Sequence, residues 1–310
     1  MKIIITGGTG FLGSKIVKRL IKEGYQVVLL KRKTSNCSRI EKVLRQCRVY
    51  HLDAKNASGK PESLEEIFQR EQPDGVIHCA VSYGRKDDET VEVAKTNLLF
   101  GLELLESASK AGCKFFINTG SYSTKQLAYG RVTQKIYMAD YTLSKYQFIC
   151  WGEEFASLGK IRFYSMDLEH IFGEDDVEGK FIRYVEHSCI HNVPKLELSD
   201  GLQERDYIYS ENVVDAYMTV IENVEKLPMF QQFQVGMGYP VTLKEFVTMI
   251  ARVAESKTEL CFGARPRNDN EPSRSVADIG SLEAMGWKPR YSREEGVAEM
   301  MKRDKEMGLL

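Results

Sequence analysis

The N-terminal half of the chain alternates short apolar runs with amphipathic stretches. Residues 2–6 form an apolar, β-branched run that predicts a strand, and residues 11–23 carry Leu and Ile at helical spacing. The same pattern predicts further strands over residues 26–30, 48–52, 75–79 and 114–118, and further helices over residues 91–111 and 141–158. Strands that alternate with helices predict a parallel sheet covered on both faces.

This alternation weakens after about residue 165. Residues 173–179 are polar and loop-like, whereas residues 205–223 restore one strand-then-helix unit. We therefore expect an α/β protein with a Rossmann-type doubly wound parallel sheet and a smaller C-terminal α/β domain. The first domain is expected to hold residues 1–165 and about 205–223. The second is expected to hold about 166–204 and 224–310.

Composition narrows the choice of function classes. The 310 residues carry a net charge of −1, which gives no overall basic excess for nucleic acid or an anionic membrane. No apolar stretch approaches the ~18 residues of a membrane span. The seven cysteines are scattered without a CxxC pair, which predicts reduced thiols in a cytoplasmic protein rather than a disulfide framework or a metal site.

A glycine-rich turn joins the first predicted strand to the first predicted helix. Gly7, Gly10 and Gly13 allow a tight turn, close packing of helix on strand, and close approach of backbone to a pyrophosphate. The helix N-terminus would then present N–H groups and a positive dipole to the phosphates. The spacing of three and three differs from the generic dinucleotide fingerprint, and a purely structural turn is the alternative.

The second strand ends in a run of cations. An acidic residue at this position would bond both ribose hydroxyls, but the sequence has Lys31, Arg32 and Lys33 instead. Arg matches phosphate geometry and Lys adds a point charge, so the run favours the 2′-phosphate of NADP(H) over NAD. The alternative is a solvated charge run.

Tyr141 and Lys145 form the candidate catalytic pair. Their i, i+4 spacing on one helix lets the phenol and the ammonium point into one cleft. A nearby cation lowers the pKa of a phenol, so we expect Lys145 to tune Tyr141, and Lys145 can also bond ribose hydroxyls. Ser121, at the end of the 114–118 strand, is the candidate for binding the reacting oxygen, with Thr119 the main rival and Ser123 a weaker one.

Together these motifs resemble the extended short-chain dehydrogenase/reductase family, also called the NAD-dependent epimerase/dehydratase family. The resemblance covers essentially the whole chain and includes TGGTGFLG at 6–13, KTNLLFG at 95–101 and RDYIY at 205–209. It implies that Asp53 binds the adenine amine and that Arg205 clamps a substrate diphosphate, although both could be ordinary ion-pair residues. The full expected cofactor set is Gly7, Gly10, Phe11, Leu12, Gly13, Lys31, Arg32, Lys33, Asp53, Ala80, Asn97, Tyr141 and Lys145.

A closer resemblance is to the nucleotide-sugar 4-ketoreductases of deoxysugar pathways. It is carried by segments such as LEHIFGEDD at 168–176 and LEAMGWKP at 282–289. The substrate it implies is a nucleoside-diphosphate 4-keto-6-deoxyhexose, CDP- or dTDP-linked, whose product feeds a bacterial surface polysaccharide such as an O-antigen. The expected substrate-binding residues are Ser82, Tyr83, His170, Lys180, Arg205 and Arg267.

The expected reaction is reduction, in which Tyr141 protonates the developing alkoxide and Ser121 bonds the same oxygen. A 4-epimerase with retained NAD is the first rival, and the basic run counts against it. A 4,6-dehydratase would need an Asp-Glu pair after the serine, where this chain has Tyr122 and Ser123. A non-catalytic redox-sensing or RNA-binding protein is the third rival. We also expect a homodimer through a four-helix bundle built from the helices at 91–111 and 141–158.

Overall fold

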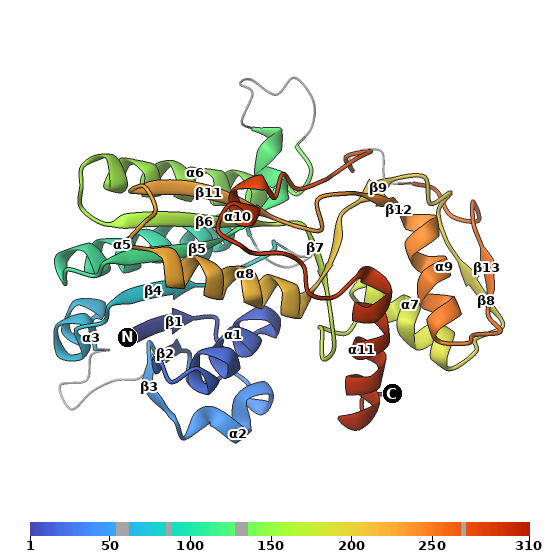
Figure 1. The fold of residues 1–310 in the computed structure, drawn as a ribbon, viewed down its shortest axis with the longest axis horizontal. Helices are drawn as coiled ribbons and strands as arrows, with labels where there is room; N and C mark the ends of the chain where they lie inside the picture. The colour runs from blue at the N-terminus through green and yellow to red at the C-terminus, as the bar shows by residue number, and fades with distance from the viewer. Residues whose placement is uncertain (54–61, 85–88, 128–135, 268–270) are drawn as a thin grey trace. The chain divides into compact units, whose positions relative to one another are not determined.

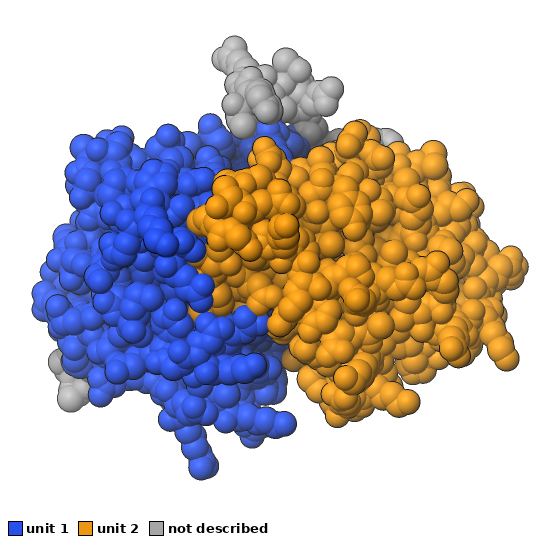
Figure 2. Space-filling view, in the orientation of Figure 1, with its two compact units in different colours: residues 1–167, 220–233 blue, residues 168–219, 234–310 orange. Residues whose placement is uncertain are grey.

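The computed structural model describes residues 1–53, 62–84, 89–127, 136–267 and 271–310. The chain folds into two compact units, which are coloured separately in Figure 2. The first unit holds residues 1–167 and 220–233, and the second holds residues 168–219 and 234–310.

A seven-stranded sheet forms the first unit's centre, and its strands follow one another in the order β11-β6-β5-β4-β1-β2-β3 (Figure 1). β1, β2, β3, β4 and β5 pair in parallel, with Ile4 opposite Val28 and Val76. The strands are β1 Lys2–Thr6, β2 Gln26–Lys31, β3 Cys47–His51, β4 Gly75–His78, β5 Phe115–Ser121, β6 Arg162–Leu168 and β11 Phe230–Val235. The sequence of strands in space confirms the expected doubly wound fold.

Helices cover this sheet because the buried strands are apolar on both faces. Val28, Val76 and Phe116 pack with the helices α3, α5 and α6 in one core cluster. On the other face, Val17 of α1 meets Ile5 and Leu29 around Gly8. The helices are α1 Phe11–Lys22, α3 Leu64–Glu71, α4 Thr90–Ala94, α5 Phe100–Lys110 and α6 Ala139–Ser157, with the short turns η1 Ser38–Ile40, α2 Glu41–Leu44 and η3 Tyr122–Gln126.

The helix predicted over residues 91–111 is interrupted. Between α4 and α5 the chain forms a π-helical turn, η2, over Lys95–Leu99, and Asn97 in this turn is fully buried. Periodicity alone did not predict this turn, because one inserted residue barely changes the apolar pattern. The strand predicted over residues 114–118 is also longer than expected, since β5 continues to Ser121.

The second unit is built from three two-stranded sheets and the helices that pack on them. β7 His170–Phe172 pairs with β10 Tyr207–Tyr209, β8 Lys195–Glu197 with β13 Glu259–Cys261, and β9 Glu204–Arg205 with β12 Val241–Thr242. Its core includes Tyr207 stacked on Phe246 with ring centroids 4.0 Å apart. The helices are α7 Phe181–Ile190, α8 Ser210–Asn223, which ends in the first unit, α9 Leu243–Val253, α10 Gly280–Glu283 and α11 Arg293–Glu306.

The observed units differ from the expected division in two segments, 205–219 and 224–233. Residues 205–219 belong to the second unit, because β9 and β10 pair with strands of that unit. The segment that returns to the first unit is 220–233, because β11 extends the large sheet beside β6.

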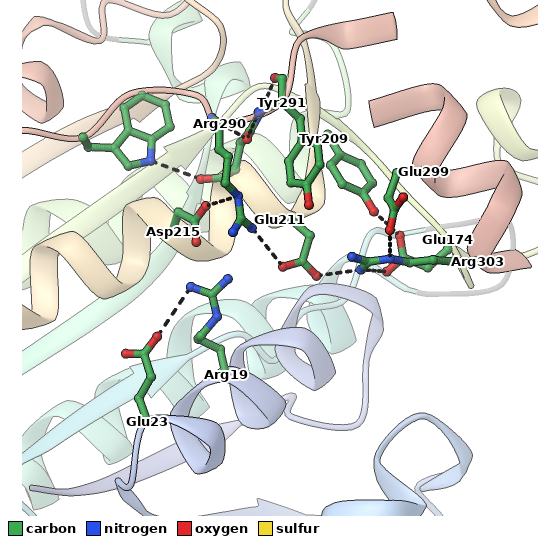
Figure 3. A network of polar contacts seen from close by, with 12 residues as sticks. Arg19, Glu23, Glu174, Tyr209, Glu211, Asp215, Arg290, Tyr291, Glu299 and Arg303 are labelled. Carbon is green, nitrogen blue, oxygen red and sulfur yellow. Dashed lines mark hydrogen bonds and ion pairs between the residues drawn. The ribbon is translucent and has the colours of Figure 1, made fainter. Parts of the chain in front are cut away.

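Charged side chains tie the helices of the second unit together (Figure 3). Arg303 on α11 bonds Glu174 at 3.2 Å, Glu211 at 3.1 Å and Glu299 at 2.8 Å. Tyr209 donates to Glu174 at 2.8 Å. Arg303 is therefore bonded to carboxylates from three separate parts of this unit, and each of these hydrogen bonds is charge-assisted.

Candidate active site

The glycine turn follows β1 directly and is shaped by two close approaches. Gly7 has a φ of +67°, and a Cβ there would lie 2.5 Å from the backbone nitrogen of Ala80. A Cβ on Gly13 would overlap the carbonyl of Gly7. Glycine is therefore required at both positions, at Gly7 by conformation and space and at Gly13 by the packing of α1 on the turn.

Gly10 has a different environment. A Cβ there would meet the Gly7 carbonyl oxygen at 3.2 Å and no other described atom within 4 Å. Gly10 also caps α1 without a side chain, and the first turn holds no acidic residue. Helix geometry leaves the first N–H groups of α1, on Phe11, Leu12 and Gly13, without intrahelical acceptors. These N–H groups and the absence of a side chain at Gly10 would suit the phosphates of a dinucleotide, and the contact of this turn with a cofactor stays a prediction.

The cations after β2 lie beside Asp53. Lys31 ends the strand, and Arg32 and Lys33 are exposed. The Lys33 backbone N–H donates to the Asp53 carboxylate at 2.7 Å. This hydrogen bond lowers the pKa of Asp53, with smaller contributions from His51 and Lys31. The arrangement brings the expected ribose-end residues together and leaves two cationic side chains available to an anionic group.

Tyr141 and Ser121 meet at the carboxyl end of β5. Ser121 is the last residue of the strand, and its side chain bonds Tyr141 and contacts the Ser123 hydroxyl at 3.0 Å. Tyr141 is 9% exposed, and its ring stacks on Tyr83 with centroids 5.4 Å apart. The two hydroxyl groups can therefore donate to one oxygen atom placed between them.

Burial raises the pKa of Tyr141, Tyr83 and Asp167 raise it further, and the Ser121 hydrogen bond lowers it. We expected Lys145 to lower this pKa, so the direction of the shift differs from the expectation. The physical reason is desolvation, which penalises the phenolate in a closed site. The phenol is thus held in its protonated form, which suits a general acid.

Lys145 lies one helical turn after Tyr141 and is 2% exposed. Its ammonium donates to the Thr119 carbonyl at 2.8 Å. Burial lowers its pKa to about 8, while Cys79 and Asp167 oppose the decrease. Thr119 thus contributes its carbonyl to the site, and its hydroxyl contacts the Cys79 thiol at 3.2 Å.

Asn97 anchors the loop after β4 to the catalytic helix. Its side-chain oxygen accepts from the Ser82 N–H at 2.8 Å, and its amide donates to the Ser82 carbonyl and to the Ser144 hydroxyl. Ala80 and Tyr83 lie in the same loop, and the Ala80 N–H points to the Thr6 hydroxyl at 3.4 Å. Direct contact of Asn97 with a cofactor stays a prediction, because its side chain already bonds the protein.

Sequence reasoning missed Asp167, a carboxylate close to this cluster. Asp167 lies near the end of β6 and is 6% exposed. Its charge acts on both Tyr141 and Lys145. The sequence did offer one sign of this residue, an aspartate inside an otherwise apolar strand. Because Asp167 is far in sequence from Tyr141, its position near the catalytic pair could not be predicted.

The expected diphosphate clamp lies in the second unit. Arg205 on β9 is 1% exposed, donates to the Glu204 carbonyl at 2.8 Å and pairs with Glu271 at 2.7 Å. A buried guanidinium with one flanking carboxylate can exchange that partner for an anionic ligand. Arg267 is half-buried in the loop after β13. Glu271, the ion-pair partner of Arg205, lies four residues further along the chain.

The other expected substrate residues of this unit are partly exposed. His170 begins β7, and its ring lies 3.7 Å from the Glu169 carboxylate and edge-on to Tyr207. Lys180, at the start of α7, pairs with Asp176 at 2.9 Å. Their contact with a substrate stays a prediction.

Comparison with known proteins gives a family and a fold. The model of the NAD dependent epimerase/dehydratase family matches residues 3–236. The chain is 32% identical over 304 residues to CDP-abequose synthase of Salmonella typhimurium, covering 97% of each chain. No helix within the described ranges is both long and apolar enough to cross a membrane.

Two solved structures show the same architecture. The UDP-glucose 4-epimerase of Thermotoga maritima with UDP-glucose superposes with a TM-score of 0.80 at 23% identity, over 99% of both chains. The UDP-glucose 4-epimerase of Thermus thermophilus with NAD gives a TM-score of 0.79 at 22% identity, over 98% of this chain and 99% of the other. At these identities the likeness supports the fold.

Proposed function

The chain belongs to the NAD dependent epimerase/dehydratase family, and from that premise we propose that it is an NADP-dependent oxidoreductase acting on a nucleotide sugar. The reaction is reduction of the C4 keto group of a nucleoside-diphosphate 4-keto-6-deoxyhexose, linked to CDP or dTDP. The product serves deoxysugar and O-antigen biosynthesis. The likeness to CDP-abequose synthase over nearly the whole chain supports this substrate class.

The observation that carries the proposal is geometric: the hydroxyl groups of Ser121 and Tyr141 meet at the carboxyl end of β5, one helical turn from the buried ammonium of Lys145. Burial raises the pKa of Tyr141 above its ordinary value, so the group enters the reaction as a proton donor. Reduction of a ketone needs a donor at the oxygen, where negative charge develops. A bound nicotinamide would supply the hydride to the carbonyl carbon.

The protein's own groups complete this chemistry. Tyr141 delivers its proton to the developing alkoxide, and Ser121 donates a hydrogen bond to the same oxygen. Lys145, held by the Thr119 carbonyl, supplies a positive charge beside the phenolate that remains. Arg205 holds the diphosphate after exchanging Glu271 for it.

The preference for NADPH rests on the segment after β2. Arg32 and Lys33 are exposed there, and the neighbouring carboxylate of Asp53 accepts from a backbone N–H. A 2′-phosphate would meet the two cations of Arg32 and Lys33, which outnumber the single neighbouring carboxylate of Asp53.

Exposed apolar side chains on α5 and α6 support a homodimer as part of the proposal. Leu99, Leu143, Trp151 and Leu158 are exposed at or next to these helices. A shallow groove there is lined by Leu99, Leu102, Trp151 and Phe155, with Glu103 and Glu106 beside them. Exposed apolar patches of this kind mark interaction surfaces. We therefore include a homodimer through these helices in the proposal, and Trp151→Glu should convert it to monomer in sedimentation velocity.

The direct test is NADPH oxidation with a panel of CDP-, dTDP-, UDP- and GDP-linked 4-keto-6-deoxyhexoses, repeated with NADH. We expect rapid turnover of one CDP- or dTDP-linked member, faster with NADPH, and loss of it in Tyr141→Phe. Tyr146→Phe removes a phenol from the same helix and should retain activity. Absence of turnover, with interconversion of a non-keto sugar nucleotide by protein holding NAD, would instead establish a 4-epimerase.

A further inference from the structure

The carboxylate of Asp167 lies against Gly120, in the strand end that also holds Thr119 and Ser121. We propose that Asp167 is a positioning residue that keeps the cluster of Ser121, Tyr141 and Lys145 in its proton-donating state. The inference rests on the proposed reduction and deepens it, since it names the group that sets the pH range of the reaction.

A hydrogen-bonded chain fixes the carboxylate. The Ser165 hydroxyl donates to Asp167 Oδ1 at 2.7 Å, and the Asn118 amide donates to the Ser165 hydroxyl at 3.2 Å. Asn118 and Ser165 are both 0% exposed, and they lie on β5 and β6, which are neighbours in the sheet. The carboxylate is therefore held by strands and has little freedom to move away from the site.

Gly120 brings this carboxylate next to the catalytic groups. A Cβ on Gly120 would overlap Asp167 Oδ1 and would lie 2.6 Å from the Ser165 hydroxyl. Gly120 is flanked by Thr119, whose carbonyl holds Lys145, and by Ser121, which bonds Tyr141. The negative charge thus lies against a peptide segment, Thr119–Ser121, that contacts both catalytic side chains.

The charge acts in one direction on both groups. Burial lowers the pKa of Lys145 and raises that of Tyr141, and Asp167 raises both. The other titratable groups that face this cluster are the thiol of Cys79, whose pKa burial raises to about 11, the imidazole of His78, whose pKa burial lowers to about 3, and the phenol of Tyr83. Cys79 and His78 are neutral at pH 7, so neither replaces the carboxylate. Lys145 and Tyr141 accordingly stay protonated to higher pH than burial and their other neighbours allow.

The first test is the pH dependence of kcat for reduction in Asp167→Asn. The amide keeps the shape and accepts from Ser165 but carries no charge. We expect the pH above which kcat declines to be lower by about one unit in this variant; we call this decline the alkaline limb. The KM for the sugar nucleotide should change little. Gly120→Ala, which displaces the carboxylate without deleting it, should shift the limb in the same direction and serves if Asp167→Asn folds poorly.

Glu71→Gln is the matched control. Glu71 is a second buried carboxylate of the same unit, 1% exposed, and it bonds Lys2, Arg48 and Tyr50 rather than the cluster. It should lower stability and leave the limb in place. A limb that is unchanged in folded Asp167→Asn, or that Glu71→Gln shifts equally, would overturn the proposal.

A second readout does not require turnover. Calorimetric titration of NADPH in buffers of different ionisation enthalpy reports the protons taken up on binding. Uptake is expected because ribose hydroxyls of a bound cofactor would accept hydrogen bonds from Lys145 in its charged form. At pH 7.5 we expect a larger proton uptake for Asp167→Asn than for the unmodified protein, because loss of the carboxylate lowers the pKa of free Lys145. Equal uptake in both would refute the role of Asp167. If no ketosugar is turned over but uptake differs as expected, the proposed reaction fails and the role of Asp167 stands.

Discussion

Two cationic side chains, one in each unit, differ in how completely the protein neutralises them. Lys145 is buried and donates to a neutral carbonyl, and burial lowers its pKa to about 8. Arg303 contacts three carboxylates; although burial opposes it, Tyr209 and these carboxylates raise its pKa above the ordinary value. The comparison teaches that a cation surrounded by several carboxylates contributes to stability. A buried cation without such partners can gain or lose a proton during a reaction.

The largest expected effect is that of Lys145→Met. We expect kcat/KM for ketosugar reduction to fall about a thousandfold, because the phenolate loses its neighbouring cation. The free energy of unfolding should be unchanged or higher by up to about 3 kcal/mol, since a desolvated charge is removed. Steady-state kinetics and urea unfolding measure the two quantities. Lys110→Met, on the exposed face of α5, is the control; retained activity with lost stability would make Lys145 a structural residue.

Arg205 is intermediate between Lys145 and Arg303, because it is buried and, among the described residues, pairs with the one carboxylate of Glu271. Arg205→Met should raise KM for the nucleotide sugar by ~10- to 100-fold, the magnitude of one lost charge-assisted hydrogen bond, and leave kcat within a few-fold. Arg274→Met, which removes an exposed ion pair with Glu204, should leave KM unchanged. An unchanged KM in Arg205→Met would show that Arg205, like Arg303, has a structural role and does not bind the substrate.

The smallest effect on catalysis is expected for Arg303→Met. Activity should stay within about twofold, while the free energy of unfolding falls by about 1–3 kcal/mol, because carboxylates on α8 and α11 lose their shared cation. Urea unfolding followed by circular dichroism measures this. Arg252→Met breaks the exposed pair with Glu294 and should cost less than about 0.5 kcal/mol. A loss of activity in Arg303→Met without loss of stability would contradict the comparison.

The sequence predicted those parts of the fold that depend on local signals. The β1 strand was predicted to the residue, and α1 to within one residue, because an apolar run, glycines and a helical repeat mark their ends. Tyr141 and Ser121 were brought together as expected, since the ends of parallel strands and the helices that follow them converge at one edge of the sheet.

What could not be predicted depends on contacts that are distant in sequence. The strand β11 reads FQQFQV, a weak pattern typical of a sheet edge, so its return to the first unit was missed. Asp167 and Glu271 acquire their significance from partners at least 22 and 66 residues away, Lys145 and Arg205, and no spacing rule connects them.

The π turn at Lys95–Leu99 has a consequence for how this chain tolerates insertions and deletions. A π turn holds one residue more than an α-helix needs, and each residue of an α-helix advances the chain by about 100°. Deleting one residue from this turn would rotate Asn97 away from either Ser82 or Ser144, although every apolar residue of α5 could still be buried. Helical content would survive such a deletion while the register between the loop and the catalytic helix would not. The inserted residue thus sets the rotation of Asn97 relative to Ser82 and Ser144. Deleting it should leave the circular dichroism spectrum unchanged and abolish turnover.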